Sequence, residues 1–229
     1  MLAPTDFRLF GPAHLSIIAG VPACAAALAL LSRRRPNHTT WIRLSLGALL
    51  ALNALCWYAY RFALLGIRLP QGLPFELCDV SLWLTVYSLL RLNQISFELA
   101  YYWGLAGAAM AVLTPDLMAP LLSPSSIIFF IGHGGLIVSI LYLLWSHRLR
   151  PRPKSWRFAF IALNIYAAGA GIFDFVSGAN YLYLRNKPAS ASLLNVMGPW
   201  PLYIFAADLL ALTMFLVMAI PFRKSRKAM

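Results

Sequence analysis

Residues 14–35 read HLSIIAGVPACAAALALLSRRR, an apolar run that ends in three arginines. An α-helix needs about 20 apolar residues to cross roughly 30 Å of hydrocarbon, so this run predicts a membrane span over 14–32. A secretory signal carries its basic residues before the apolar stretch, whereas Arg33, Arg34 and Arg35 follow it here. We therefore expect a mature transmembrane helix rather than a cleaved leader.

The whole chain has the same apolar character. Of its 229 residues 61% are hydrophobic and only 11% are charged, and the mean hydropathy is +0.72. Soluble domains are about half apolar and a quarter charged. The composition therefore predicts an all-α polytopic transmembrane helical bundle, forming a single integral membrane domain over residues 1–229. We expect membrane lipids as its partners.

Seven apolar segments have the length of a span. They lie near residues 14–32, 41–64, 74–92, 96–115, 126–147, 156–181 and 202–222. The third and fourth are interrupted by Arg91, Asn93 and Glu98, which favours a tight helical hairpin or a strong tilt. Losing either one would change the parity of the topology.

Basic residues occur in short runs between these segments rather than on one face, so the net charge of +12 indicates membrane topology and not a nucleic-acid partner. With the N-terminus outside, fourteen of the nineteen Lys and Arg fall inside: Arg33, Arg34, Arg35, Arg43, Arg91, Arg148, Arg150, Arg152, Lys154, Arg157, Arg223, Lys224, Arg226 and Lys227. Outside remain Arg8, Arg61, Arg68, Arg185 and Lys187. This asymmetry is typical of a seven-span protein with a cytoplasmic C-terminus.

Ionisable residues inside a membrane are expensive to bury and are candidates for function. Four predicted spans carry them at a similar depth, roughly 10 Å below the outer surface at 1.5 Å per residue. They are Glu76, Cys78 and Asp79 in the third span, His133 in the fifth, Asp174 in the sixth and Asp208 in the seventh. We predict a polar site in the outer half of the bundle.

Helical spacing places part of this set on polar or small faces. One face holds Cys78, Ser81, Thr85 and Ser88, and another holds Asn164, Ala167, Gly171, Asp174, Gly178 and Tyr181. Glycines on both sides of His133 let helix backbones approach closely. Such stripes are also ordinary packing seams in membrane bundles, so they do not define a site alone.

A cysteine and a histidine on different helices can act as nucleophile and base, because an imidazole generates the reactive thiolate. Asp174 or Asp208 would orient the imidazole of His133, and acyl transfer is the natural reaction class. The early position of Cys78 in its helix favours the thiolate, whereas neighbouring carboxylates oppose it. The sequence leaves this balance open.

Three other interpretations use the same residues. A metal site lacks any recognised ligand spacing, so we predict none. In a transporter, Asp174, Asp208 and His133 would relay protons or hold a substrate. In a structural interpretation, the two aspartates pair with Arg61, Arg68 or His14 and only hold the bundle together.

Several segments resemble those of the bacterial YwaF-like integral membrane proteins, which are similar to the eukaryotic transmembrane protein 164 family. The matching residues are Leu73-Pro-Phe-Glu-Leu-Cys78, Tyr102-Trp-Gly-Leu-Ala-Gly107, Thr114-Pro-Asp116, Gly132-His133-Gly134, Asn180-Tyr-Leu-Tyr-Leu-Arg-Asn-Lys187-Pro188, Ser192-Leu-Leu194 and Gly198-Pro-Trp-Pro-Leu-Tyr203. They cover spans three to seven.

The resemblance implies a multi-pass fold and a cysteine-dependent phospholipid acyltransferase, and we expect no cofactor and a place in the bacterial cytoplasmic membrane. Its catalytic pair would be Cys78 and His133. Glu76 and Asp79 would line the substrate site, and Asn180 and Tyr181 would donate hydrogen bonds to the developing oxyanion. The alternatives are a non-enzymatic membrane protein that binds a lipid or small ligand, and a small transporter.

Overall fold

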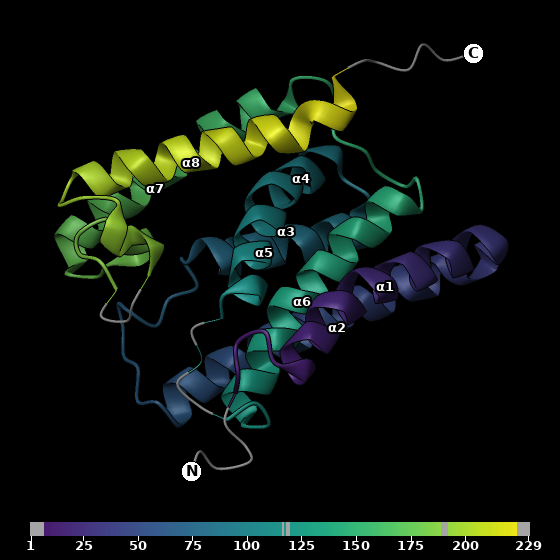
Figure 1. Cartoon of the computed structure of the whole chain (residues 1–229), viewed down its shortest axis with the longest axis horizontal. Coiled ribbons are helices and arrows are strands. Elements are labelled where there is room, and N and C mark those ends of the chain that lie inside the picture. The colour runs from purple at the N-terminus through teal and green to yellow at the C-terminus, as the bar shows by residue number, and fades with distance from the viewer. Residues whose placement is uncertain (1–6, 116, 118–119, 189–191, 224–229) are drawn as a thin grey trace.

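The computed structural model describes residues 7–115, 117, 120–188 and 192–223. Within these ranges every regular element is a helix, which confirms the all-α prediction (Figure 1). Asp116 of the family-like motif and Lys224, Arg226 and Lys227 of the C-terminal basic run lie outside the described residues. The α-helices are α1 (Pro12–Arg34), α2 (Thr39–Ala63), α3 (Leu77–Arg91), α4 (Gln94–Leu99), α5 (Leu105–Leu113), α6 (Pro124–Trp145), α7 (Ser155–Ser177) and α8 (Leu202–Ala219).

Five helical segments in the described part of the chain are long and apolar enough to cross a bilayer. They are Pro12–Arg34, Pro36–Ala63, Pro124–Trp145, Ser155–Ser177 and Leu202–Phe222. Many of their large apolar side chains are exposed; Phe175, for example, is 86% exposed. A surface of this kind suits contact with lipid, so the protein has the build of a multi-pass membrane protein.

The expected third and fourth spans are shorter and form the hairpin that their interrupting residues predict. Leu92 ends α3 in a left-handed conformation with φ 52°. Asn93 then caps α4, because its side chain accepts a hydrogen bond of 2.9 Å from the Ser96 amide. A π-helical turn, Ala100–Gly104, joins α4 to α5. A Cβ on Gly104 would lie 3.0 Å from Leu136 and 3.2 Å from Ser81, so the glycine lets α3 and α6 approach this turn.

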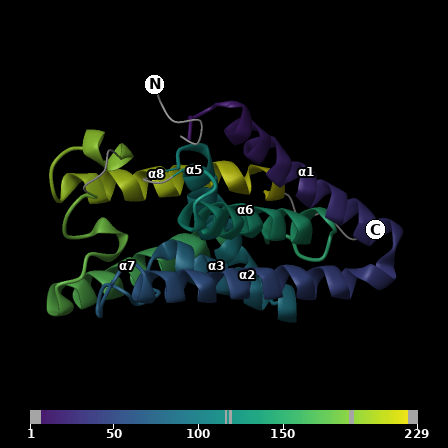
Figure 2. The ribbon, with the colours of Figure 1, turned by 90° about the horizontal axis from the view of Figure 1, so that it is seen from below.

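Helix α6 occupies the centre of the bundle. It packs against α1, α2, α3 and α5, while α7 and α8 form a separate pair that contacts α4, α5 and the π-helical turn (Figure 1). Seen from below, α6 lies between a layer with α1 and α8 and a layer with α2, α3 and α7 (Figure 2). Gly132 sits where α6 meets α2, since a Cβ there would lie 2.9 Å from the Asn53 side chain.

The expected sixth span ends earlier than predicted. Helix α7 stops at Ser177, and Gly178 adopts φ +80°, a left-handed conformation that glycine accepts without a steric penalty. The polar face predicted through Asp174, Gly178 and Tyr181 is therefore broken, because Tyr181 belongs to a loop that folds back over the end of the helix.

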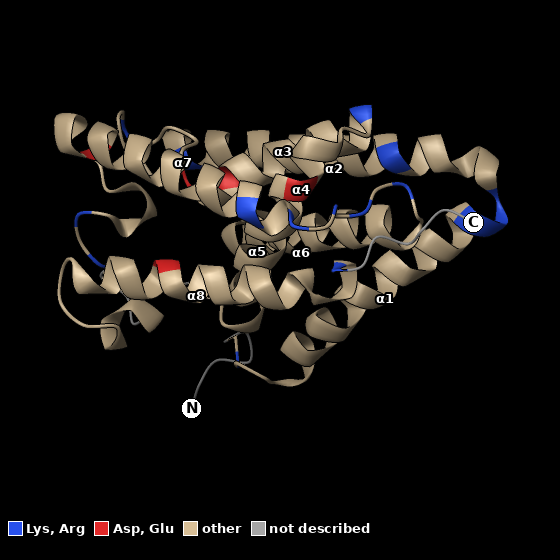
Figure 3. Cartoon of the chain, turned by 90° about the horizontal axis from the view of Figure 1, so that it is seen from above, with Lys and Arg blue, Asp and Glu red and all other residues tan. Residues whose placement is uncertain are grey.

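Basic residues mark one end of the bundle, which we call the basic end; it comprises the helix ends at Arg34, Arg91 and Arg223 and the connection 146–154. In Figure 3, Lys and Arg cluster around helix ends and connections, whereas the helices are largely free of charge. Arg33 donates to the Trp145 carbonyl, and Arg148 donates to the Thr39 hydroxyl at 3.1 Å. These contacts bring the ends of α1, α2 and α6 to one level.

The hairpin turn also reaches the basic end. Gln94 donates to the Arg150 carbonyl at 2.7 Å. Arg152 donates through Nη2 and Nε to the buried carboxylate of Glu98 at 2.7 and 2.9 Å, and its backbone amide donates to the same group at 2.8 Å. This ion pair raises the pKa of Arg152 through hydrogen bonding and direct charge attraction. Glu98 therefore fastens the 146–154 connection to α4.

Candidate functional site

Residues 73–79, the first turn of α3 and the segment before it, are called the head of α3 here, and two other parts of the chain hold them: α7 and the loop that follows it. The Tyr166 hydroxyl on α7 donates to the Phe75 carbonyl at 2.6 Å. Glu76, which precedes the first turn, accepts a hydrogen bond of 3.3 Å from the Leu182 amide. Tyr181, the residue before Leu182 in the loop after α7, donates from its hydroxyl to the Leu73 carbonyl at 3.0 Å. These contacts tie the start of α3 to the otherwise separate α7–α8 pair.

Helix α2 adds a polar cluster on the other side. Asp79, in the first turn of α3, accepts a hydrogen bond of 3.3 Å from the Tyr58 hydroxyl, which itself accepts one of 3.0 Å from the Trp83 indole. The guanidinium of Arg61 is close enough to attract both the Glu76 and the Asp79 carboxylate. A cation and two carboxylates thus surround the start of α3.

Cys78 lies in the middle of this cluster and carries a free, exposed thiol. The carboxylates that act on it are those of its neighbours Glu76 and Asp79. No hydrogen bond to the thiol is present within the described residues. Cys24 and Cys56 are also free and exposed, so exposure does not distinguish Cys78; its charged surroundings do.

His133 is fixed in one tautomer by its own helix. Its Nδ1 lies 3.0 Å from the Phe129 carbonyl oxygen, one turn earlier. A carbonyl can only accept, so Nδ1 carries the proton and Nε2 keeps a free lone pair. The Phe129 ring packs beside the imidazole, with centroids 4.3 Å apart and ring planes inclined by 36°. The contact that orients this imidazole is therefore a backbone carbonyl and neither Asp174 nor Asp208.

Cys78 and His133 lie on helices that pack together, at similar heights. A Cβ on Gly104 would lie 3.2 Å from Ser81 of α3 and 3.0 Å from Leu136 of α6, so these two residues are at the same level. Cys78 precedes Ser81 by three residues and His133 precedes Leu136 by three, which is a rise of about 4.5 Å along each helix. Helices α3 and α6 are neighbours. No hydrogen bond joins the two side chains in the described structure.

Asp174 lies at the far end of α7 rather than beside His133. Its side chain is fully buried beneath the loop that starts at Gly178, and neither carboxylate oxygen accepts a hydrogen bond of normal geometry. The Tyr181 amide and the Arg185 guanidinium are the groups that act on it electrostatically. Arg185 donates to two backbone carbonyls of the same turn, those of Asp174 and Ala179. The structure thus associates Asp174 with the loop that holds the head of α3.

Asp208 pairs within the α7–α8 unit. Its Oδ1 accepts a hydrogen bond of 3.2 Å from the Asn164 side chain across the two helices. Neither aspartate has the structural partners that the sequence suggested. His14 instead connects α1 to α5 through a hydrogen bond of 2.7 Å to the Val112 carbonyl. Arg61 attracts the carboxylates at the head of α3.

The side chains of Asn180 and Tyr181 already bond backbone groups, Asn180 within its own loop and Tyr181 in the segment before α3. Asn180 accepts from the amides of Arg185 and Asn186, both at 3.0 Å, and donates to the Asn186 carbonyl. The Tyr181 hydroxyl lies within donating distance of the Pro70 and Leu73 carbonyls. In this structure both residues shape the loop above α3. Within the described residues, no three His, Cys, Asp or Glu side chains are grouped so that they could hold a metal ion.

Tyr58 and Tyr166 are site residues that the sequence did not single out, and Arg61 was expected only as a partner of Asp174 or Asp208. An aromatic residue near a helix end predicts an interfacial position, and Tyr58 fits that pattern. Its bond to Asp79 depends on which helices are neighbours, which no spacing along one helix reveals. The signal available in the sequence was a tyrosine and an arginine three residues apart in one predicted span, Tyr58 and Arg61, and two acids at the start of the next, Glu76 and Asp79.

One family model matches the chain. It is described as the TMEM164 family, and it aligns with residues 9–219, a range that contains all eight α-helices of the described structure. No curated protein and no solved structure matches.

Proposed function

This chain belongs to the TMEM164 family of membrane proteins, and we propose that it transfers acyl chains between membrane lipids through Cys78. The observation that carries the proposal is the tautomer of His133. Because Nδ1 is engaged by the Phe129 carbonyl, the free Nε2 lone pair is the acceptor that a general base needs. Cys78 offers an accessible thiol at a similar height on the neighbouring helix.

The reaction would follow two steps. His133 Nε2 takes the proton of Cys78, and the sulfur attacks the ester carbonyl of a donor lipid to form a C–S bond. The ester C–O bond then breaks, and the departing lysolipid alkoxide takes the proton back from His133. A hydroxyl of the acceptor lipid attacks the thioester in the reverse sequence, which regenerates the thiol. No cofactor is required.

The two side chains must come within hydrogen-bond reach during this reaction. Catalytic hydrogen bonds are often long in the free enzyme and shorten only in the substrate complex. The head of α3 is attached to the loop after α7 by the Glu76–Leu182 and Tyr181–Leu73 contacts. A lipid that enters beside α3 would therefore contact elements from both parts of the bundle.

We also propose the seven-span topology with the N-terminus outside and the C-terminus in the cytoplasm. The hairpin turn lies at the basic end with the 146–154 connection, as the Gln94 and Glu98 contacts support. Segment 94–113 spans about 30 Å, and α3 spans about 22 Å from its start to Arg91. Residues 64–76, between α2 and α3, would cover the part of the bilayer thickness that α3 does not. Cys78 would then lie in the outer half of a bacterial cytoplasmic membrane.

Acyl exchange by the purified protein tests the proposal. The full chain is reconstituted in liposomes with a phospholipid labelled in its acyl chain and an unlabelled lysophospholipid acceptor. We expect label to appear in newly formed diacyl lipid, in proportion to the amount of protein. Retention of lipid without exchange would make the protein a lipid-binding protein instead. Proton-coupled uptake of a solute that is lost in Asp208→Asn, again without exchange, would make it a transporter.

A further inference from the structure

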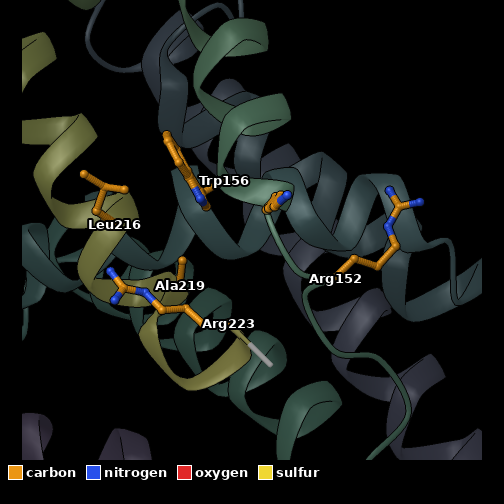
Figure 4. Close-up of a pocket in the computed structure, with 6 residues that line it drawn as sticks. Arg152, Trp156, Leu216, Ala219 and Arg223 are labelled. Atoms are coloured by element: carbon orange, nitrogen blue, oxygen red, sulfur yellow. The ribbon is translucent and has the colours of Figure 1, made fainter. Parts of the chain in front are cut away.

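A second polar site lies at the basic end, remote from Cys78. A cavity of about 250 Å³ opens between the start of α7 and the end of α8 (Figure 4). Its lining residues are Arg152, Lys154, Trp156, Leu216, Ala219 and Arg223. Three of these six side chains are basic and none is acidic. An anion is therefore the complementary ligand.

Two of the basic residues have charge available for a ligand. Arg152 is committed to Glu98, and its side chain lies on the far side of the cavity from Arg223 with the guanidinium directed away (Figure 4). Lys154 and Arg223 form no ion pair with any described residue. Because Glu98 neutralises Arg152, the cavity carries about two uncompensated positive charges from Lys154 and Arg223.

The cavity also offers neutral donors and an apolar wall. The Trp156 indole makes no hydrogen bond within the described structure, although its ring lies 5.4 Å from the Arg157 guanidinium. Lys154 precedes the first turn of α7, and no side chain caps that end of the helix. Leu216 and Ala219 form the apolar side. This is the mixture of groups that binds a phosphate carried on an apolar molecule.

We propose that this cavity binds the phosphate group of an anionic phospholipid from the leaflet at the basic end. Lys154 and Arg223 would contact the phosphate oxygens, and the indole of Trp156 would donate one hydrogen bond. The helices that frame the cavity continue in exposed apolar side chains, such as Phe158 and Val217, along which acyl chains can lie. A soluble phosphate would gain nothing from that surface.

Lipid retention measured by native mass spectrometry tests this site. The full chain is placed in phosphatidylcholine nanodiscs containing a minority of phosphatidylglycerol, and the ratio of the two lipids that stay bound is determined. Each basic side chain near an anionic lipid contributes about fivefold in affinity. We therefore expect Lys154→Gln/Arg223→Gln to lower the preference for phosphatidylglycerol about 30-fold, and Arg223→Gln alone, which leaves the turn at Lys154 intact, about fivefold.

The matched control is Arg34→Gln/Arg35→Gln, which removes the same charge from exposed positions outside the cavity. It should lower the preference for phosphatidylglycerol clearly less than the double cavity variant does, because these side chains meet headgroups only at the membrane surface. An unchanged preference in both cavity variants would overturn the proposal, as would an equal loss in the control. A third arm adds millimolar inorganic phosphate to nanodiscs of phosphatidylcholine alone. Stabilisation by phosphate there, lost in Arg223→Gln, would assign the cavity to a soluble phosphate and overturn the lipid assignment.

Discussion

Cys78→Ser is expected to lower acyl exchange by about a thousandfold or more, because a neutral hydroxyl is a far weaker nucleophile than a thiolate and removal of a nucleophile disables the whole catalytic group. The substitution changes one atom at an exposed position, so the fold should persist. Elution from a sizing column and thermal unfolding in detergent check that persistence.

Cys24 and Cys56 provide matched controls for this substitution. Both thiols are free and exposed, yet they lie on α1 and α2 rather than at the head of α3. Cys24→Ser and Cys56→Ser should exchange acyl chains at the wild-type rate. A comparable loss in either control, or full activity in Cys78→Ser, would contradict the assignment of the nucleophile.

His133→Ala is expected to slow exchange by about 10²–10⁴-fold, the usual contribution of a positioned general base. The physical reason is the loss of the Nε2 lone pair that the Phe129 carbonyl leaves free. The same variant should react more slowly at Cys78 with a thiol electrophile, while labelling of Cys24 and Cys56 in the same sample stays constant.

A purely structural histidine would also reduce activity when removed, so the test includes chemical rescue. Imidazole added to the medium should restore part of the exchange in His133→Ala but none in Cys78→Ser. His147→Ala serves as the control, because His147 lies at the basic end and bonds Arg33. Failure of rescue together with lowered thermal stability would assign His133 to packing.

The sequence predicts the helices well because each is an apolar run bounded by polar or basic residues. The break between Arg91 and Glu98 predicts a hairpin, and the structure confirms one through the left-handed Leu92 and the Asn93 cap. The end of α7 was predicted wrongly. Apolar composition continues to Tyr181, but Gly178 turns the chain, and a periodic pattern does not reveal that a glycine will adopt φ +80°.

The depth of a residue along its helix does not reveal which helices are neighbours, and the candidate site shows this limit. Cys78 and His133 lie on neighbouring helices at similar heights, but Asp174 is buried beneath a loop and Asp208 is paired with Asn164. Asp79 meets Tyr58 because α2 and α3 are adjacent. The relationship to transmembrane protein 164 is confirmed by the family model, whereas the likeness to YwaF-like proteins stays a prediction.

The most direct measurement is a peptide map of the acylated protein. The wild type is incubated with a donor phospholipid in the absence of acceptor, denatured in acid, digested and analysed by mass spectrometry before and after neutral hydroxylamine, which cleaves thioesters. The account predicts that the mass of one acyl chain appears on the peptide containing Cys78 and disappears with hydroxylamine. Acyl exchange without any adduct on Cys78, or an adduct on Cys24 or Cys56 instead, would contradict it.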